Sequence, residues 1–187
     1  MTKKPGFTLI EMLITMALVT TLSAVISSLY VVGFRTFKEQ MAISTVQSDG
    51  QTILDRINTD AKNGLSIEQS YLGYTSGSST IIIRVPAIDN NNNIIYSGTN
   101  MLSDRIIYYY QDKSIHKIIY ADPASSRYSK NAIDSILDKK ILVLNFTYEP
   151  EVSSATLVTT TISSEIIVGN HSEKIQLTGK ARLRNHI

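Results

Sequence analysis

The hydrophobic and polar positions of the chain follow two different patterns, and the change falls near residue 64. Residues 12–34 carry no charge over 23 positions, a run that spans about 35 Å as a helix. That length exceeds the roughly 30 Å of a bilayer core. From Ser66 onward apolar and polar residues alternate in short runs, which is typical of strands. The pattern predicts one membrane-spanning helix followed by a polar, strand-rich domain.

The helical pattern continues beyond the charge-free run. Apolar residues keep a spacing near 3.6 along the next 30 positions, namely Phe34, Phe37, Met41, Val46, Ile53, Leu54, Ile57 and Ala61. Asn63 and Gly64 form a C-terminal stop signal, and Gly50 weakens the helix enough to allow a bend near residues 48–50. We therefore expect one helix over residues 7–63, apolar over 7–34 and amphipathic over 35–63.

The remaining residues, 64–187, are expected to form the β-rich domain. The predicted elements are a strand over 79–85 that ends at Pro86, a hairpin over 104–122 with its turn at Gln111–Ser114, a strand over 141–150 with Leu142, Leu144, Phe146 and Tyr148 on one face, and a hairpin over 155–186 with its turn at Gly169–His171. Polar linkers are expected over 71–79 and 87–101. These elements give an α+β fold class, a long N-terminal hydrophobic helix packed on an antiparallel β-sheet.

The last predicted strand shows the clearest alternation. Ile175, Leu177, Gly179, Ala181 and Leu183 share one face of it. The other face carries a basic row of three residues, Lys180, Arg182 and Arg184. Three cations provide only a modest, salt-sensitive attraction for a polyanion. The row is therefore either an ordinary solvated face or a contact surface for DNA or another subunit.

Charge and cysteine content narrow the function classes. Apart from Lys3 and Lys4, 16 basic residues face 16 acidic ones, so the chain has no overall field that would attract nucleic acid. The sequence contains no cysteine, and the fold cannot depend on disulfides. We expect its stability to come from packing and strand pairing.

Candidate chemistry is sparse in this sequence. His116, His171 and His186 show no metal-ligand spacing. Asp89, Asn91 and Asn93 resemble the start of a calcium loop, but the glycine and the closing glutamate of that loop are missing, and a polar turn is the simpler interpretation. The sequence has no nucleophile elbow and no phosphate-binding loop. It predicts a protein that is not an enzyme and holds no cofactor or metal.

The N-terminal stretch KKPGFTLIEML allows three interpretations. A secretory signal conflicts with the glutamate at position 11, with an apolar run longer than the usual 7 to about 15 residues, and with the lack of a small-residue cleavage site. A simple membrane anchor explains the length, and Lys3 and Lys4 would keep the N-terminus inside. It gives Glu11 no role, however, although a carboxylate costs roughly 2.5–3.5 kcal/mol at the centre of a membrane helix.

The third interpretation rests on resemblance. A short basic leader, Gly6, Phe7, Thr-Leu-Ile-Glu and about twenty apolar residues follow in the order and spacing of type IV prepilins and type II secretion pseudopilins, which the stretch resembles. The resemblance implies that a prepilin peptidase removes residues 1–6 by cutting after Gly6, and methylates the new amino group of Phe7. It also implies a pilin fold, insertion into the inner membrane, and a C-terminal domain outside the cytoplasm before assembly into a pilus or pseudopilus.

Glu11 acquires a role under this interpretation. The cut creates a cationic amine on Phe7, and the family picture pairs this glutamate with the amine of a neighbouring subunit in the filament. Two opposite charges buried between apolar helices fix their axial register. The expected partners are therefore the prepilin peptidase, other pilin subunits and the inner membrane.

The downstream sequence narrows the resemblance. The helical stretch 51–64, the tyrosine-bearing hairpin and the terminal Arg184-Asn185 are similar to W-type minor pilins and J-type pseudopilins. The expected function is a minor pilin or pseudopilin subunit assembled through its N-terminal helix. The alternative is a pilus-tip adhesin or DNA-uptake receptor on a membrane anchor, with the basic row as its contact surface.

Overall fold

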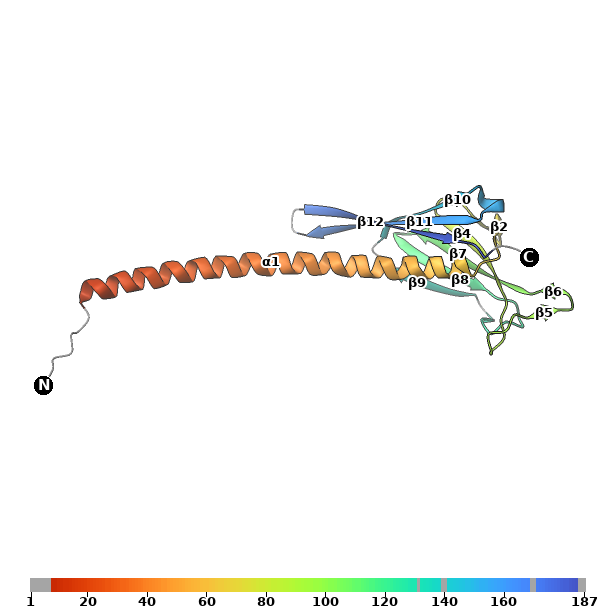
Figure 1. The fold of residues 1–187 in the computed structure, drawn as a ribbon, viewed down its shortest axis with the longest axis horizontal. Helices are drawn as coiled ribbons and strands as arrows, with labels where there is room; N and C mark the ends of the chain where they lie inside the picture. The colour runs from red at the N-terminus through yellow and green to blue at the C-terminus, as the bar shows by residue number, and fades with distance from the viewer. Residues whose placement is uncertain (1–7, 131, 139–140, 169–170, 185–187) are drawn as a thin grey trace. The chain divides into compact units, whose positions relative to one another are not determined.

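The computed structural model describes residues 8–130, 132–138, 141–168 and 171–184 (Figure 1). The chain divides into two compact units, Met1–Ser44 and Thr45–Ile187. The elements are α1 (Leu9–Lys62), β1 (Ser66–Ile67), β2 (Ser70–Tyr71), β3 (Tyr74–Thr75), β4 (Thr80–Pro86), β5 (Tyr96–Ser97), β6 (Asn100–Met101), β7 (Ser103–Gln111), β8 (Ser114–Tyr120), β9 (Ile133–Asp138), β10 (Ile141–Glu149), the 3₁₀ turn η1 (Val152–Ser154), β11 (Leu157–Val168) and β12 (His171–Arg182).

Helix α1 confirms the predicted long N-terminal helix. It runs without interruption from Leu9 to Lys62, so the predicted weak point at Gly50 does not break it. The helix ends where the stop signal stands, with the backbone N–H of Asn63 and Gly64 bonded to the carbonyls of Thr59 and Ala61 at 3.0 Å each. The residues that form the expected apolar face from Ile53 to Ala61 are buried.

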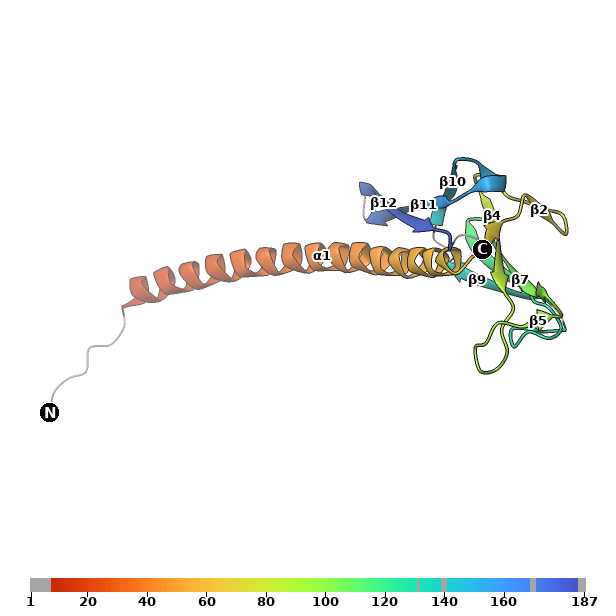
Figure 2. The ribbon, with the colours of Figure 1, turned by 45° about the vertical axis from the view of Figure 1, so that its right-hand side comes forward.

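The strands of the second unit form two main antiparallel sheets. The larger has the order β1-β4-β7-β8-β9 and the smaller the order β10-β11-β12. Two short hairpins, β2–β3 and β5–β6, form separate two-stranded sheets. Figures 1 and 2 show the C-terminal part of α1, in yellow-orange, beside both sheets. An α+β architecture of one long helix and antiparallel sheets is the pilin fold that the sequence predicts.

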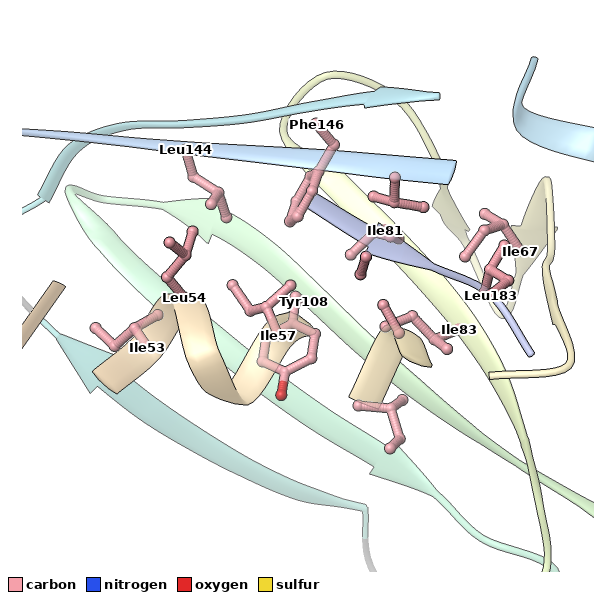
Figure 3. Close-up of a cluster of buried hydrophobic side chains, with 14 of the residues drawn as sticks. Ile53, Leu54, Ile57, Ile67, Ile81, Ile83, Tyr108, Leu144, Phe146 and Leu183 are labelled. Carbon is pink, nitrogen blue, oxygen red and sulfur yellow. The ribbon is translucent and has the colours of Figure 1, made fainter. Parts of the chain in front are cut away.

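The core of this unit lies where the helix meets the two sheets. Figure 3 shows Leu54 and Ile57 of α1 together with Tyr108 of β7 and with Leu144 and Phe146 of β10. All five are buried, and Ile57 and Tyr108 are fully inaccessible. Burying a large apolar side chain contributes about 1.5–3 kcal/mol each. The amphipathic face of the helix therefore unites two sheets that would otherwise each expose an apolar face.

Glycines let strand β12 approach the helix closely. A Cβ placed on Gly50 would lie 2.8 Å from Cδ1 of Leu177, and one placed on Gly179 would lie 2.9 Å from Cγ of Leu54. Each glycine thus accommodates a leucine of the other element. Gly50 is explained by this close approach, and not by a bend.

The hairpin predictions are confirmed for the described residues. Strands β7 and β8 meet at Asp112 and Lys113, whose φ values of 50° and 59° match a two-residue turn of the kind that follows the twist of a hairpin. Strands β11 and β12 pair along their whole length, and Gly169 and Asn170 of the predicted turn lie outside the described residues. Leu144 and Phe146 of β10 are buried as expected, while the side chain of Leu142 lies outside the described ones.

Three features differ from the sequence prediction. Strand β2 ends at the first residue of the expected linker 71–79, β3 lies within that linker, and β5 and β6 lie within the expected loop 87–101. Strand β9 had no predicted counterpart. The amphipathic half of the helix was expected to pack its apolar stripe on the sheet domain, but Phe37 and Met41 of that stripe are about half exposed. The unpredicted strands show little alternation of apolar and polar residues, and they form because neighbouring segments of the chain pair with them. They are β2, β3, β5, β6 and β9.

Candidate functional site

The N-terminal end of α1 is closed by a reciprocal cap between Thr8 and Glu11. The Thr8 backbone N–H and hydroxyl donate to Oε2 of Glu11 at 2.9 and 3.0 Å, and the Glu11 N–H donates to the Thr8 hydroxyl at 3.3 Å. This is the capping box of a helix that begins at Leu9. The Thr-Leu-Ile-Glu sequence signals this cap directly, and sequence reasoning had considered only the charge of Glu11.

Predicted processing residues stand next to this cap. Gly6 and Phe7 lie outside the described residues, and the described chain begins at Thr8. Thr8 is bonded to Phe7 through its peptide group, so the Glu11 carboxylate lies one residue away from the predicted new N-terminus. The structure thus fixes the direction of the carboxylate toward the start of the helix.

Helix residues 9–34 present apolar side chains on every side. Their large apolar side chains are about half to four-fifths exposed, at Leu9, Ile10, Met12, Leu13, Ile14, Met16, Leu18, Val19, Leu22, Val25, Ile26, Leu29, Tyr30, Val31, Val32 and Phe34. By length and composition, α1 is the helix among the described residues that could cross a membrane. A helix that is apolar all round requires lipid or other helices around it.

Hydroxyl groups in this apolar segment are bonded within the helix itself. Thr15 donates to the Glu11 carbonyl at 2.7 Å, Thr20 to the Met16 carbonyl at 2.9 Å and Thr21 to the Ala17 carbonyl at 2.5 Å. An unbonded hydroxyl would be costly in lipid. These small residues therefore let neighbouring helices approach without leaving a polar group unsatisfied.

The second half of α1 is fixed to the larger sheet by Asp60. Its Oδ2 atom accepts hydrogen bonds from the Tyr108 hydroxyl at 2.5 Å and from the Lys117 ammonium at 2.6 Å. Burial, and then the charge of Asp60, raise the pKa of Tyr108 well above its ordinary value. The contact joins the helix to β7 and β8 and sets the rotation of the helix on the sheet. The sequence pattern did not predict this contact.

The predicted basic row lies where the alternation of β12 places it. Lys180, Arg182 and Arg184 are exposed, while Ala181 and Leu183 between them are buried. Lys180 pairs across the sheet with Thr159, and Arg182 with Leu157. Lys180 and Arg182 therefore lie on the outward face of β12, and Arg184 continues the row just beyond the end of that strand.

The loop of Asp89 to Asn93 is a polar turn closed by its own carboxylate. Asp89 Oδ1 accepts from the backbone N–H of Asn91 at 2.8 Å and of Asn93 at 2.9 Å. The bonds from Asn93 lower the pKa of the Asp89 carboxyl. The Asp89 carboxylate therefore accepts hydrogen bonds from the backbone of its own turn and stabilises that turn.

Asp104, at the start of β7, is fully buried among polar partners. It accepts from Nη1 of Arg127 at 2.7 Å, from the Ser125 hydroxyl at 2.8 Å and from the Asp122 backbone N–H at 2.9 Å. Arg127 also donates to the Pro86 carbonyl at 2.9 Å. The carboxylate thus holds the long segment between β8 and β9 against the sheet, in a chain without cysteines. Sequence reasoning gave no signal for this contact.

The outer face of the larger sheet carries aromatic residues that sequence reasoning did not combine. Its apolar base is Ile82, Ile107 and Ile118. Four tyrosines pack against this base, namely Tyr71, Tyr74, Tyr109 and Tyr120. His116 stacks on Tyr109 with ring centroids 4.7 Å apart. The register of the β7–β8 hairpin could have predicted the pairing of Tyr109 with His116. It could not have predicted that the β2–β3 hairpin packs beside them.

Comparison with known proteins identifies the N-terminus. Residues 1–27 match the family model described as the prokaryotic N-terminal methylation motif. No curated protein matches the chain. No solved structure matches it either. The motif covers the predicted cleavage site, the capping box and most of the apolar segment.

Proposed function

We propose that this chain, a type IV pilin-like prepilin by its N-terminal motif, serves as a minor pilin or pseudopilin subunit. Prepilin peptidase processes it, and it assembles with other pilins through α1. The observation that carries the proposal is the methylation motif at the start of a continuous helix whose apolar side chains are exposed. The role is structural, since the chain contributes a helix to a bundle and displays a β-rich domain.

The proposed processing removes residues 1–6. The peptidase cuts after Gly6, where no side chain obstructs the approach of an enzyme to the backbone, and methylates the amine of Phe7. Lys3 and Lys4 keep the leader on the cytoplasmic side. Residues 7–34 then span the inner membrane once, and residues 64–187 form the domain outside the cytoplasm.

The proposed assembly step depends on the orientation of Glu11. The Thr8 cap holds the carboxylate at the N-terminal end of the helix, where amines of neighbouring mature chains can reach it. A carboxylate and an amine that meet between apolar helices compensate each other's desolvation. A purely apolar surface would allow the helices to slide, whereas this pair selects one axial register.

Two variants test the processing step in cells that contain the cognate peptidase. We expect Gly6→Ala to slow removal of the leader strongly, as followed by mass spectrometry of the N-terminus. Gly33→Ala is the matched control, since a Cβ at Gly33 meets nothing within 4 Å. A native product that begins at Met1 in the unaltered protein would refute the proposal.

The assembly step is tested by separating the charge of Glu11 from its cap. Glu11→Gln keeps the size of the side chain and its hydrogen bonds to Thr8, but removes the charge. Thr8→Val removes the hydroxyl but keeps the carboxylate and the backbone N–H that donates to it and orients it. We expect both variants to be cleaved, and only Glu11→Gln to be lost from purified filaments. Normal incorporation of Glu11→Gln would contradict the charge-pair role.

The downstream sequence supports a W-type minor pilin or a J-type pseudopilin. The support comes from the helical stretch 51–64, the tyrosine-bearing β7–β8 hairpin and the terminal Arg184-Asn185, of which Asn185 lies outside the described residues. Co-purification with neighbouring pilin subunits after mild cross-linking tests the assignment. We expect other low-abundance subunits of one filament to be recovered in defined proportions.

A second candidate function is a tip adhesin or DNA-uptake receptor. It is favoured by the exposed basic row of Lys180, Arg182 and Arg184. If the row binds DNA, replacing all three residues with glutamine should weaken retention of DNA by the full chain in detergent, and the effect should fade as salt rises. If the unaltered chain and the triple glutamine variant retain DNA equally, the basic row is a solvated face and not a DNA-binding surface.

A further inference from the structure

The C-terminal end of the apolar segment of α1 carries two stacked aromatic rings and a cation. The rings of Tyr30 and Phe34 have their centroids 6.3 Å apart and their planes 8° from parallel. The ammonium of Lys38 lies 4.6 Å from the centre of the Phe34 ring, within the range of a cation–π contact. All three side chains are exposed. They form a ridge along one side of the helix, the Tyr30–Phe34–Lys38 column.

The opposite end of the same segment carries the Glu11 carboxylate. The N–H and hydroxyl of Thr8 donate to this carboxylate and direct it toward the N-terminus, away from the apolar residues that follow. Glu11 and Tyr30 are 19 positions apart, which is about 28 Å along a helix. The hydrocarbon core of a bilayer is roughly 30 Å thick. The distance between these two residues therefore matches the distance between the two edges of the core.

The proposed membrane segment, residues 7–34, is longer than the core that it crosses. Its 28 residues span about 42 Å as a helix, so two registers have to be compared. If the core began at residue 7, Glu11 would lie about 6 Å inside the hydrocarbon and Phe34 about 10 Å outside it. If the core lies between Glu11 and Tyr30, the carboxylate reaches the inner headgroups and the rings lie at the outer interface.

The second register has the smaller physical cost. A charged side chain is costly in hydrocarbon, and the cost falls when the side chain reaches the interface. Tyrosine is enriched at membrane interfaces, where its ring contacts apolar chains and its hydroxyl contacts water. The second register leaves Leu9 and Ile10 among the inner headgroups. That arrangement is less costly than burial of Glu11, because it takes no charge out of water.

Lys38 reaches the layer of lipid phosphates in this register. Helix side chains lean toward the N-terminus, and the Lys38 ammonium lies over the ring of Phe34. Phe34 is about 6 Å beyond Tyr30 along the helix, and the headgroup layer extends about 5–7 Å beyond each edge of the core. Arg35 has Glu39 four positions further on, a spacing that suits a helical ion pair. Lys38 is therefore the cation that we assign to phosphate.

We propose that the Tyr30–Phe34–Lys38 column anchors α1 at the outer interface of the membrane and thereby holds Glu11 at the inner interface. The Lys38 ammonium binds the phosphate of a phospholipid in the outer leaflet. The inference rests on the proposed single crossing of the membrane, and not on filament assembly. Under this arrangement Glu11 stays hydrated in the membrane, and its charge needs an amine partner only when the helix leaves the lipid.

The experiment compares the depths of two labels in the full chain, in vesicles of phosphatidylcholine and phosphatidylglycerol. Because the chain has no cysteine, Ile14→Cys and Ser27→Cys each provide one site for a nitroxide. These sites lie three positions inside Glu11 and Tyr30. Electron paramagnetic resonance gives the depth of each label from its collisions with oxygen and with a water-soluble nickel chelate.

We expect the two labels to lie equally deep. In the alternative register, the label at position 27 lies at the edge of the hydrocarbon and is about 10 Å shallower than the label at position 14. That result would overturn the inference and leave the membrane crossing intact. Exposure of both labels to the chelate would refute the crossing itself.

Two double variants test whether the column sets this depth. Phe34→Ala with Lys38→Gln removes the ring and the cation, whereas Phe34→Tyr with Lys38→Arg keeps both kinds of group. In the first variant we expect the helix to shift outward by about 5 Å, because Leu9 and Ile10 move into the hydrocarbon. The outer label then becomes the shallower one. The second variant should keep equal depths. Equal depths in both variants would show that the column does not set the depth.

Discussion

The two halves of α1 are one continuous helix, yet they are built for different surroundings. Residues 9–34 leave their apolar side chains exposed and bond their hydroxyls within the helix. Residues 50–61 bury one face in a protein core and fix it with the Asp60 contact. The first half is therefore specified for lipid or for neighbouring helices, and the second for its own sheets. Helical structure alone does not distinguish them; the surroundings of the side chains do.

The largest expected effect comes from shortening an isoleucine in each half. Ile57→Ala should lower the free energy of unfolding of the β-rich unit by about 2–5 kcal/mol, since it leaves a cavity in a fully buried site. Ile26→Ala, at a side chain that is 57 % exposed, should change it by less than about 0.5 kcal/mol. Urea unfolding in detergent, followed by tyrosine fluorescence, measures both. Equal losses would abolish the distinction between the halves.

The second largest effect on stability is expected from loss of the contact between Asp60 of the helix and the larger sheet. Asp60→Ala should cost about 3 kcal/mol, because it leaves the Lys117 ammonium and the buried Tyr108 hydroxyl without their shared acceptor. Asp55→Ala is the matched control on an exposed face of the same helix, where the carboxylate accepts a hydrogen bond from Gln51. The same unfolding assay applies, and a loss as small as that of the control would mean that packing alone orients the helix.

The close crossing of β12 on the helix should be sensitive to a single methyl group. Gly179→Ala places a Cβ against Leu54, and overpacking of this kind costs about 1–3 kcal/mol. Gly77→Ala adds the same methyl group where nothing lies within 4 Å, and should be nearly neutral. A thermal melt of both variants makes the comparison. A stable Gly179→Ala protein would mean that the strand can shift at little cost.

The smallest effect is the dependence of stability on alkaline pH. The folded state raises the pKa of Tyr108 by burial and by the charge of Asp60, so stability is complete below the unfolded pKa of about 10 and is lost as pH rises above it. The loss is about 1.4 kcal/mol for each pH unit. Tyr108→Phe should remove this contribution, and Tyr128→Phe, at an exposed site, should not. The free energy of unfolding of the three proteins, measured between pH 9 and about 11, tests this prediction. Identical slopes in all three proteins would contradict the assignment.

The sequence by itself determined the local features. The charge-free run, the Asn63-Gly64 stop, the β7–β8 turn and the alternation of β12 each arise from neighbouring residues, because helix and strand periods are properties of short segments. The methylation motif is of the same kind, since a peptidase recognises a continuous stretch of chain.

Only the tertiary structure decided which distant residues meet. The Asp60–Tyr108–Lys117 contact, the burial of Asp104 against Arg127 and the approach of Tyr74 to Tyr109 join segments 48, 23 and 35 positions apart along the chain. Short strands such as β2, β3 and β9 have too little alternation of apolar and polar residues to be predicted from the sequence. They form because neighbouring strands satisfy the hydrogen bonds of their backbone groups. Side-chain chemistry between sheets depends on how the layers pack, and that arrangement is a property of the whole core and of no single segment.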